Sequence, residues 1–330
     1  MAETLVGATY PGTSLVADGA VTCGLPRDGS ALIATPEGWL LLVPLPAGRW
    51  LTFVGDLDEG EARRLASDDT TDVVAAVIGR RVAEGIRVEK VAWASPFRMH
   101  RRLVPQLADK RCFLLGDAGH LSSPFGAEGL NSGIHDGSNL GWKLALELRG
   151  RARPGLLESF ATERLAADRH VLEVSDRLHQ LAYRAVESAR TGVTPPPPTP
   201  AQVAAMVESR SMLDVTYAGS PLVGEYPAGV QAPLTPAPGD RYPDRATLAG
   251  PGHHLLLFGA ADDSEVRRLQ RRWRDLLDIR HATTDPRRAG LATGGAVLVR
   301  PDGHIGFRAA ADSAGLAALD SHLGSYLIPG

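Results

Sequence analysis

The chain has 330 residues, of which 44% are hydrophobic and 22% are charged, and its formal net charge is −3. These values are typical of a globular protein with room for two domains, and they exclude the strongly basic surface of a nucleic-acid-binding protein. No apolar run reaches the roughly 18 residues of a membrane-spanning helix, and we expect no secretory signal at this N-terminus. Two cysteines, Cys23 and Cys112, form no disulfide framework and favour a reducing, cytoplasmic compartment.

The first region, residues 1–102, is rich in predicted strands. Short apolar runs occupy residues 15–24, 31–35, 38–44, 49–56 and 86–94, and turn residues such as Arg27-Asp28-Gly29 separate them. One helix is predicted over residues 69–84, with Asp68 or Asp69 as its N-cap and Gly85 as its stop.

The second region, residues 103–235, carries the most informative segment. Residues 111–115 are mostly apolar and end at Gly116-Asp117, which predicts a buried parallel strand. Ligands of open α/β sheets bind beyond the carboxyl ends of strands, where Asp117 could accept hydrogen bonds from sugar hydroxyls. The next helix is predicted to begin near Leu130 or Asn131, and its N-terminus would favour negative charge on a ligand.

Four glycines recur every four residues along this helix and fall on one face: Gly129, Gly133, Gly137 and Gly141. A glycine inside a helix costs roughly 0.8–1 kcal/mol relative to alanine. Such a face indicates that another backbone or a cofactor approaches closely, and a tightly packed helix pair without a ligand remains the alternative.

The chain continues with helices and then with a compact α/β region. A long helix is predicted over residues 156–190, prolines at 195–198 and 200 interrupt it, and a further helix follows over residues 201–213. The third region, residues 236–330, is predicted to contain strands at 254–259, 295–300 and 304–308 and helices at 264–277 and 313–326.

These motifs resemble those of a known family. The series Gly116-Asp117-Ala118-Gly119-His120, Pro124, Gly129-Leu130-Asn131 and Asn139-Leu140-Gly141-Trp142-Lys143 closely resembles the second flavin motif of the FAD-dependent aromatic hydroxylases. These are class A flavoprotein monooxygenases with the p-hydroxybenzoate hydroxylase fold. The last 95 residues, with Arg300-Pro301-Asp302-Gly303-His304, resemble the thioredoxin-like extension of phenol and aromatic-polyketide hydroxylases.

The resemblance implies a mixed α/β fold with three parts: a substrate-domain β-sheet, the second half of an FAD-binding domain, and a C-terminal thioredoxin-like domain. It implies a monooxygenase that uses FAD, NAD(P)H and O2 on a small aromatic or polyketide substrate. Strands within residues 15–56 would form the wall of the substrate pocket, and no catalytic base is identified. Having no cysteine, the C-terminal domain is expected to serve structure or homodimer formation rather than dithiol exchange.

The resemblance also implies the cofactor-binding residues. Gly116 would let the backbone approach the cofactor, Asp117 would contact the ribityl chain, and Pro124 would line the flavin ring. Backbone groups of Gly129, Leu130 and Asn131 would meet the pyrimidine edge. Three positions depart from the family pattern, Gly119 in place of alanine, Ala127 in place of glycine and Glu128 in place of glutamine, and we expect Glu128 to face outward.

The first flavin motif of the family, Gly-x-Gly-x-x-Gly, occurs nowhere in the sequence, and neither does the family's later Asp-Gly motif. Roughly the first 160 residues of a full-length relative would then lack a counterpart. Three interpretations stay open: a truncated or mis-started gene, one half of a split enzyme whose N-terminal FAD-binding half is encoded separately, or a flavin-free relative. The last would bind an aromatic ligand or act as a cyclase.

Other polar clusters suggest weaker hypotheses. His100, His120 and His135 lack metal-ligand spacing, and His120 is expected to orient the loop around it. Asp136 suits a helix-cap or polyol-binding role better than acid–base catalysis. His253 and His254 are expected to be exposed at the start of a strand. Arg98, His100, Arg101 and Arg102 form a basic edge that either binds an acidic ligand or is solvated.

Overall fold

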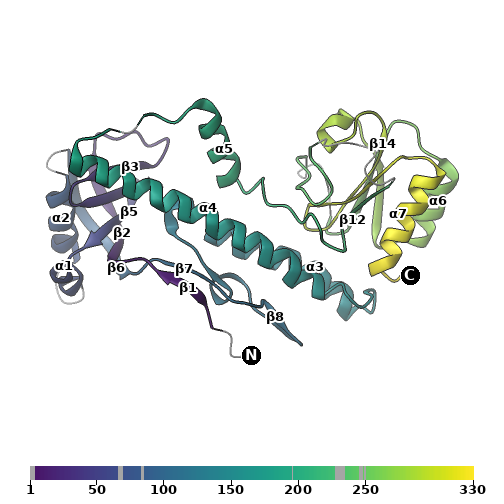
Figure 1. The fold of residues 1–330 in the computed structure, drawn as a ribbon, viewed down its shortest axis with the longest axis horizontal. Coiled ribbons are helices and arrows are strands. Elements are labelled where there is room, and N and C mark those ends of the chain that lie inside the picture. The colour runs from purple at the N-terminus through teal and green to yellow at the C-terminus, as the bar shows by residue number, and fades with distance from the viewer. Residues whose placement is uncertain are drawn as a thin grey trace.

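The computed structural model describes residues 4–65, 70–82, 85–194, 196–226, 235–244, 248 and 250–330. The predicted mixed α/β class is confirmed. The long helix α4 (Glu158–Thr191) runs from a β-rich part of the molecule toward a smaller α/β part that contains the C-terminus (Figure 1). None of the described helices combines the length and the apolar content that crossing a bilayer would require.

An antiparallel sheet of five strands dominates the β-rich part, in the order β3 (Ala31–Thr35), β4 (Gly38–Pro44), β5 (Arg49–Leu57), β2 (Thr13–Cys23) and β6 (Ile86–Phe97). Side chains alternate between its faces, as the strand period requires. One face packs against α2 (Thr70–Arg81), whose Val74, Val77 and Ile78 are buried against Leu15 and Leu40. The short helix α1 (Glu59–Arg64), which was not predicted, begins at a capping box formed by Asp58 and Glu61.

Aromatic side chains join the other face of this sheet to α4. Trp39, Phe53 and Phe97 of the sheet lie in one cluster with Tyr183 and Val186 of α4. The Tyr183 hydroxyl donates a hydrogen bond to Asp56 Oδ1 over 2.8 Å. The C-terminal half of α4 is therefore fixed against one face of the sheet whose strands within residues 15–56 were predicted to form the wall of a substrate pocket.

Small elements connect the sheet to the helices. Strands β1 (Val6–Thr9), β7 (His100–Leu103) and β10 (His120–Leu121) form an antiparallel sheet, and β8 (Ala108–Asp109) pairs with β9 (Cys112–Phe113). The predicted buried strand over residues 111–115 is wrong. Only Cys112 and Phe113 of this range form a strand, and Cys112 is exposed. Strand β9 has an antiparallel hairpin partner and no parallel neighbour among the described residues. The 3₁₀ turns η1 (Gly116–Ala118) and η2 (Pro124–Gly126) then lead into α3 (Gly129–Leu148).

The C-terminal part is a mixed sheet in the order β11 (Gly224–Tyr226), β15 (Ile305–Ala309), β14 (Gly295–Val299), β12 (His253–Phe258) and β13 (Leu277–His281). Helices α6 (Asp263–Arg272) and α7 (Ser313–Tyr326) contribute Leu269, Trp273, Leu316 and Leu323 to its main core. Strand β13 was not predicted, and the helix predicted over residues 264–277 stops at Arg272.

The expectation that His253 and His254 are exposed is wrong. Both are buried, because β12 lies between β13 and β14 and is covered from its first residue. His253 Nε2 lies 3.1 Å from the hydroxyl of Tyr326, and His254 Nδ1 lies 3.1 Å from a carboxylate oxygen of Asp278. Burial lowers the pKa of His253 to about 3, so this ring is neutral at physiological pH.

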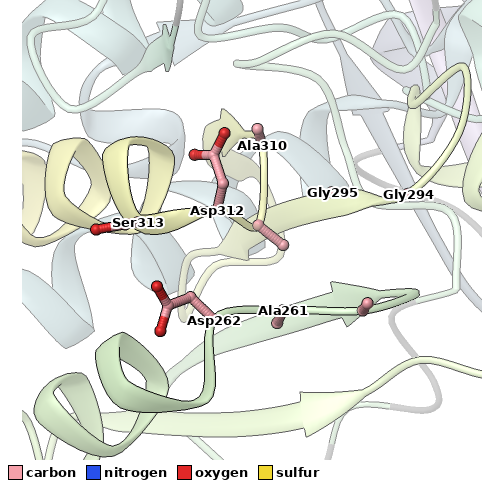
Figure 2. A pocket seen from close by; sticks show the side chains of 9 residues that line it. Ala261, Asp262, Gly294, Gly295, Ala310, Asp312 and Ser313 are labelled. Carbon is pink, nitrogen blue, oxygen red and sulfur yellow. The ribbon is translucent and has the colours of Figure 1, made fainter.

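A hollow of about 440 Å³ lies where α6 and α7 begin (Figure 2). Asp262 and Asp312 line it, and each caps the helix that follows it. Asp262 Oδ1 accepts a hydrogen bond from the Ser264 N–H over 2.9 Å, and Asp312 Oδ1 accepts one from the Gly315 N–H over 2.8 Å. Both helix N-termini are therefore satisfied from within the chain.

A buried ionic network, the Glu163–Arg300 network, docks the C-terminal part onto α3 and α4. The Arg300 guanidinium donates to both carboxylate oxygens of Glu163, over 2.6 and 2.8 Å, and to Asp302 over 2.6 Å. Lys143 Nζ donates to Glu163 over 2.7 Å. Two acidic and two basic side chains thus balance each other, all at 5% exposure or less. Burial alone would raise the pKa of Glu163, but Arg300 and Lys143 lower it to about 2.

Two neutral donors of α3 complete the network. The indole N–H of Trp142 donates to Asp302 over 3.1 Å, and the Asn139 amide donates to Glu163 over 2.7 Å. These residues belong to the sequence motif that resembled a flavin motif. The structure uses their side chains to hold two parts of the chain together.

Replacing Arg300 by methionine (R300M) is expected to lower the free energy of unfolding by about 3–5 kcal/mol, because two carboxylates would stay buried opposite Lys143 alone. R288M is the matched control, since Arg288 is 61% exposed and pairs with Asp244 at the surface, and it should cost less than about 1 kcal/mol. Denaturant unfolding followed by tryptophan fluorescence measures both. Equal losses in the two variants would contradict the role of this network.

Candidate functional site

The turn at Gly116 lies directly on α3. Gly116 adopts a left-handed conformation, with φ +56°, which suits glycine. A Cβ atom placed on Gly133 would lie 3.2 Å from the Cα atom of Gly116, so any side chain there would push the turn away. One reason for the glycine face of α3 is therefore the close approach of another backbone. Gly137 and Gly141, farther along the same face, meet nothing within 4 Å among the described residues.

The buried carboxylate of Asp136 binds this turn. Its Oδ2 atom accepts the Gly116 N–H over 2.9 Å and lies 2.8 Å from His120 Nε2, while Arg164 Nε donates to Oδ1 over 2.6 Å. Burial acts to raise the pKa of Asp136, but His120 and Arg164 outweigh it and hold this pKa below its ordinary value. His120 therefore orients the loop, as predicted. Asp136 is fully buried and holds the turn in place. The role predicted for it was different, either polyol binding or capping of a helix.

Asp168 extends the cluster. The Arg164 guanidinium donates to Asp168 Oδ1 over 2.7 Å, and so does the hydroxyl of Ser132 over 2.6 Å. His120, Asp136 and Asp168 lie close enough together to hold a metal ion. Arg164, however, lies among these groups and already supplies a positive charge at hydrogen-bond distance to both carboxylates. The cluster thus already contains its own cation and supports the loop, although Asp168 Oδ2 is buried without a hydrogen-bond partner among the described residues.

The six predicted cofactor residues fall into two groups that this support holds in place. Gly116 and Asp117 form η1, and Gly129, Leu130 and Asn131 form the first turn of α3, with Pro124 in the connecting η2 turn. The side chains of Asp117 and Asn131 are exposed and make no hydrogen bond within the described part of the chain. No side chain caps the N-terminus of α3, so its first N–H groups point outward unsatisfied.

Glu128, which precedes α3, was expected to face outward, and this expectation is wrong. The side chain is 1% exposed, and neither carboxylate oxygen has a hydrogen-bond partner among the described residues. It folds back over Gly126, where a Cβ atom would lie 2.8 Å from the carboxyl group. Burial raises the pKa of Glu128 to about 7, and the negative charge of Asp214 adds to this shift. The small residues Gly126 and Gly129 near Glu128 are the only feature of the sequence that agrees with this burial.

An aromatic stack, not predicted from the sequence, joins η2 to the sheet. The ring of His179 stacks between Tyr10, at 3.7 Å between centroids, and Tyr183, at 4.8 Å. Phe125 of η2 meets Trp39 edge to face at 4.6 Å. The loop that carries Pro124 is therefore packed against one face of the sheet whose strands within residues 15–56 were predicted to form the wall of a substrate pocket.

Three of the four side chains of the predicted basic edge bind other residues of the chain. Arg101 pairs with Asp176 of α4 over 2.8 Å, and Arg102 donates to the hydroxyl of Thr9 over 2.8 Å. His100 Nδ1 lies 2.9 Å from the same hydroxyl. These three side chains connect β1, β7 and α4, whereas Arg98 is exposed and forms no hydrogen bond or ion pair with a described residue.

The buried carboxyl of Glu128 makes stability depend on pH. Its pKa is about 7 in the folded chain and near 4.5 when unfolded, so the wild type loses stability as the pH rises between these values. E128Q should therefore raise the free energy of unfolding at pH 8 by roughly 1–3 kcal/mol and leave it unchanged at pH 4. E147Q, on the exposed side of the same helix, should show no such dependence. Thermal unfolding across this pH range measures the difference, and parallel curves for E128Q and wild type would refute it.

Comparisons with known proteins agree with this geometry. A family model described as an FAD binding domain matches residues 15–175, and one described as the C-terminal part of aromatic-ring hydroxylases matches residues 227–327. The chain is 33% identical to 6-methylpretetramide 4-monooxygenase of Streptomyces rimosus, over 89% of this chain and 58% of the relative. It is 31% identical to a putative polyketide hydroxylase of Streptomyces halstedii, over 75% of this chain and 49% of the relative. The chain thus spans less than two thirds of the length of these relatives.

Solved structures show the same fold. Anhydrotetracycline hydroxylase from Streptomyces rimosus matches 99% of this chain with a TM-score of 0.69 and 25% identity, and this match covers 66% of that structure. An aromatic hydroxylase from angucycline biosynthesis matches 98% of this chain with a TM-score of 0.66 and 26% identity, again over 66% of that structure. Motifs, fold and relatives together establish that this chain belongs to the FAD-dependent aromatic hydroxylases, a family of flavoprotein monooxygenases.

Proposed function

We propose that the chain provides the ribityl and pyrimidine half of the FAD site of a monooxygenase that hydroxylates an aromatic, polyketide-like substrate. The observation that carries this proposal is the pairing of an exposed, unbonded Asp117 with the uncapped first turn of α3. The Gly116–Gly133 contact and the buried carboxylate of Asp136 hold the two in a fixed relation. FAD, reduced by NAD(P)H, would supply the activation of O2.

The residues of the chain would bind and orient the cofactor. The Asp117 carboxylate would accept hydrogen bonds from ribityl hydroxyls, and Pro124 would line the ring. The N–H groups of Gly129, Leu130 and Asn131 would donate to the pyrimidine edge. The positive end of the α3 dipole would stabilise negative charge on that edge.

The substrate class follows from the relatives and from the sheet. The printed names of the relatives refer to 6-methylpretetramide and to a polyketide, and one solved relative, a fold match at 21% identity, is an aklavinone-11 hydroxylase in complex with FAD and aklavinone. In this chain Phe53 and Phe97 lie on the sheet face next to η2. Such a wall would exclude water and hold a flat ring, which supports a phenolic or polycyclic aromatic substrate.

A second polypeptide segment would complete the cofactor site. The outer face of α3, the α3 stripe, consists of Leu130, Ile134, Gly137, Gly141, Leu144 and Leu148. Its four large side chains are 36–78% exposed, and its two glycines face open space. We propose that a dinucleotide-binding half with the Gly-x-Gly-x-x-Gly motif covers this stripe, either fused to the chain or as a separate protein. Within this scheme residues 1–102 form the substrate region, 103–235 the C-terminal part of the FAD-binding domain, and 236–330 a thioredoxin-like domain for structure or dimerisation.

A flavin-free role on the same scaffold is the second candidate. A solved structure described as the Diels-Alderase of pyrroindomycin biosynthesis matches 99% of this chain with a TM-score of 0.66 at 22% identity, a likeness of fold alone. It supports the idea that this fold also serves ring-forming enzymes. Purified protein that shows no flavin absorbance after FAD and a dinucleotide-binding half are added would favour this cyclase or ligand-binding role.

In the presence of a dinucleotide-binding half, D117A should weaken FAD binding about tenfold or more, because the ribityl hydroxyls would lose a charged acceptor. D109A is the matched control, since Asp109 is also exposed but lies in β8 outside the site. Titration of flavin fluorescence gives both affinities. Similar affinities for D117A and D109A would remove Asp117 from the site.

Recognition of the second half can be tested on the α3 stripe. Ile134 is 59% exposed, and I134E would bury a charge in the proposed interface, so co-purification with the dinucleotide-binding half should be lost. V193E places the same charge on Val193, which is 70% exposed beyond the end of α4, and should leave co-purification intact. Retention of the complex by I134E would argue against docking on this face.

A further inference from the structure

A cavity of about 870 Å³, the α4–α5 cavity, lies between α4 and α5 (Pro200–Arg210). Its size is that of a small-molecule site. Pro196 and Pro198 belong to its lining, and the other apolar lining residues come from the two helices. These are Val174, Leu178, Leu181 and Ala185 of α4 and Val203, Ala205 and Met206 of α5.

The cavity lies on a different side of α4 from the sheet. In a helix, each residue turns about 100° from the last, so Leu181 points to nearly the opposite side from His179, and Leu178 points about 100° away from it. His179 and Ala182 are buried, and His179 belongs to the aromatic stack on the sheet side, whereas Leu181 is 50% exposed. In Figure 1, α5 lies on one side of α4, and β7 lies on the other. The proposed flavin contacts of η1 and α3 do not contribute to the lining.

Helix α5 covers this space without filling it. No residue of α5 is buried, and Val203 and Met206 remain 40% and 36% exposed although they face α4 across the cavity. The helix is stabilised locally by a capping box, in which Thr199 and Gln202 each bind the backbone of the other. Apolar side chains of both helices therefore face the cavity without closing it.

Polar groups without partners gather at the same cavity. Arg177 and Arg184 are seven residues apart on one face of α4, and neither forms a hydrogen bond or an ion pair with a described residue. The Ser209 hydroxyl and Asp214 Oδ1 are buried without a hydrogen-bond partner, while Asp214 Oδ2 lies 2.9 Å from His170 Nε2. A buried polar group left unsatisfied costs about 1–3 kcal/mol, which a ligand could recover.

We propose that the α4–α5 cavity is a second binding site, independent of the flavin, for a flat apolar molecule with an anionic oxygen and a hydrogen-bond donor. The anionic group binds between Arg177 and Arg184, which both donate to it, the donor binds Asp214, and the apolar body lies between the leucines of α4 and Met206. Aromatic carboxylates, sulfonates and phenolates that also carry a hydroxyl or amine N–H have this chemistry. The site holds such a molecule without any chemical step.

The probe that tests this site is 8-anilinonaphthalene-1-sulfonate, which combines an aromatic body, one anionic group and one N–H donor. It should bind the full 330-residue chain saturably, at one site per chain, with or without FAD. R177Q and R184Q should each raise the dissociation constant about tenfold, equivalent to roughly 1.4 kcal/mol. A185W should abolish binding by filling the cavity.

Two control variants locate the bound probe. R169Q removes an exposed arginine of α4 that does not line the cavity, and L148Q alters the α3 stripe, the other exposed apolar surface. Both should bind the probe like the wild type, and circular dichroism should show that all variants are folded. Absence of saturable binding, wild-type affinity in R177Q and R184Q, or a loss confined to L148Q would each overturn the proposal.

Discussion

Two adjacent buried side chains on α4, Glu163 and Arg164, hold the molecule together. Glu163 accepts hydrogen bonds from Arg300, Lys143 and Asn139 and so joins the C-terminal part to α3. Arg164 donates to Asp136 and Asp168 and so supports the loop with the proposed flavin contacts. Because consecutive residues of a helix point about 100° apart, these two neighbouring residues of α4 belong to two different clusters. The C-terminal part and the loop with the proposed flavin contacts are therefore both held by the same turn of α4.

The Glu163–Arg300 network satisfies the conditions under which buried charges are tolerated. Each of its charged side chains has an opposite charge at hydrogen-bond distance, and the neutral donors of Trp142 and Asn139 occupy remaining acceptor sites. The cluster around Arg164 satisfies these conditions only in part, because Asp168 Oδ2 has no hydrogen-bond partner among the described residues and burial raises the pKa of Asp168. Glu128 is the contrast, since burial without any such partner raises its pKa, whereas Arg300 and Lys143 hold the Glu163 carboxylate ionised.

Most elements could be predicted from the sequence because their signals are local. Periodicity and caps placed the helices at 156–190 and 313–326 and the strands at 31–35 and 38–44 within a few residues of their observed bounds. The prediction of a buried strand at 111–115 was wrong because an apolar pattern indicates burial but does not identify the partner strand. That partner is set by residues elsewhere in the chain. The same holds for Glu128 and His253, whose burial depends on what packs over them.

In the candidate site, too, local features could be predicted from the sequence and contacts between distant residues could not. The motif predicted which residues gather around η1 and the start of α3, and the position of Gly133 against Gly116 follows from the glycine spacing. It could not reveal that Asn139, Trp142 and Lys143 contact Asp302 and Glu163, because those partners are 20 or more residues away in the sequence. The α4–α5 cavity was equally out of reach, since it arises from how far two helices stand apart.

The docking role of Asn139, Trp142 and Lys143 has an evolutionary consequence. A lineage that lost the C-terminal domain would lose Arg300 and Asp302 together, and it would leave Glu163 and Lys143 with a newly uncovered surface around them. Asn139 and Trp142 would then also lack Asp302, which accepts a hydrogen bond from each of them in this chain.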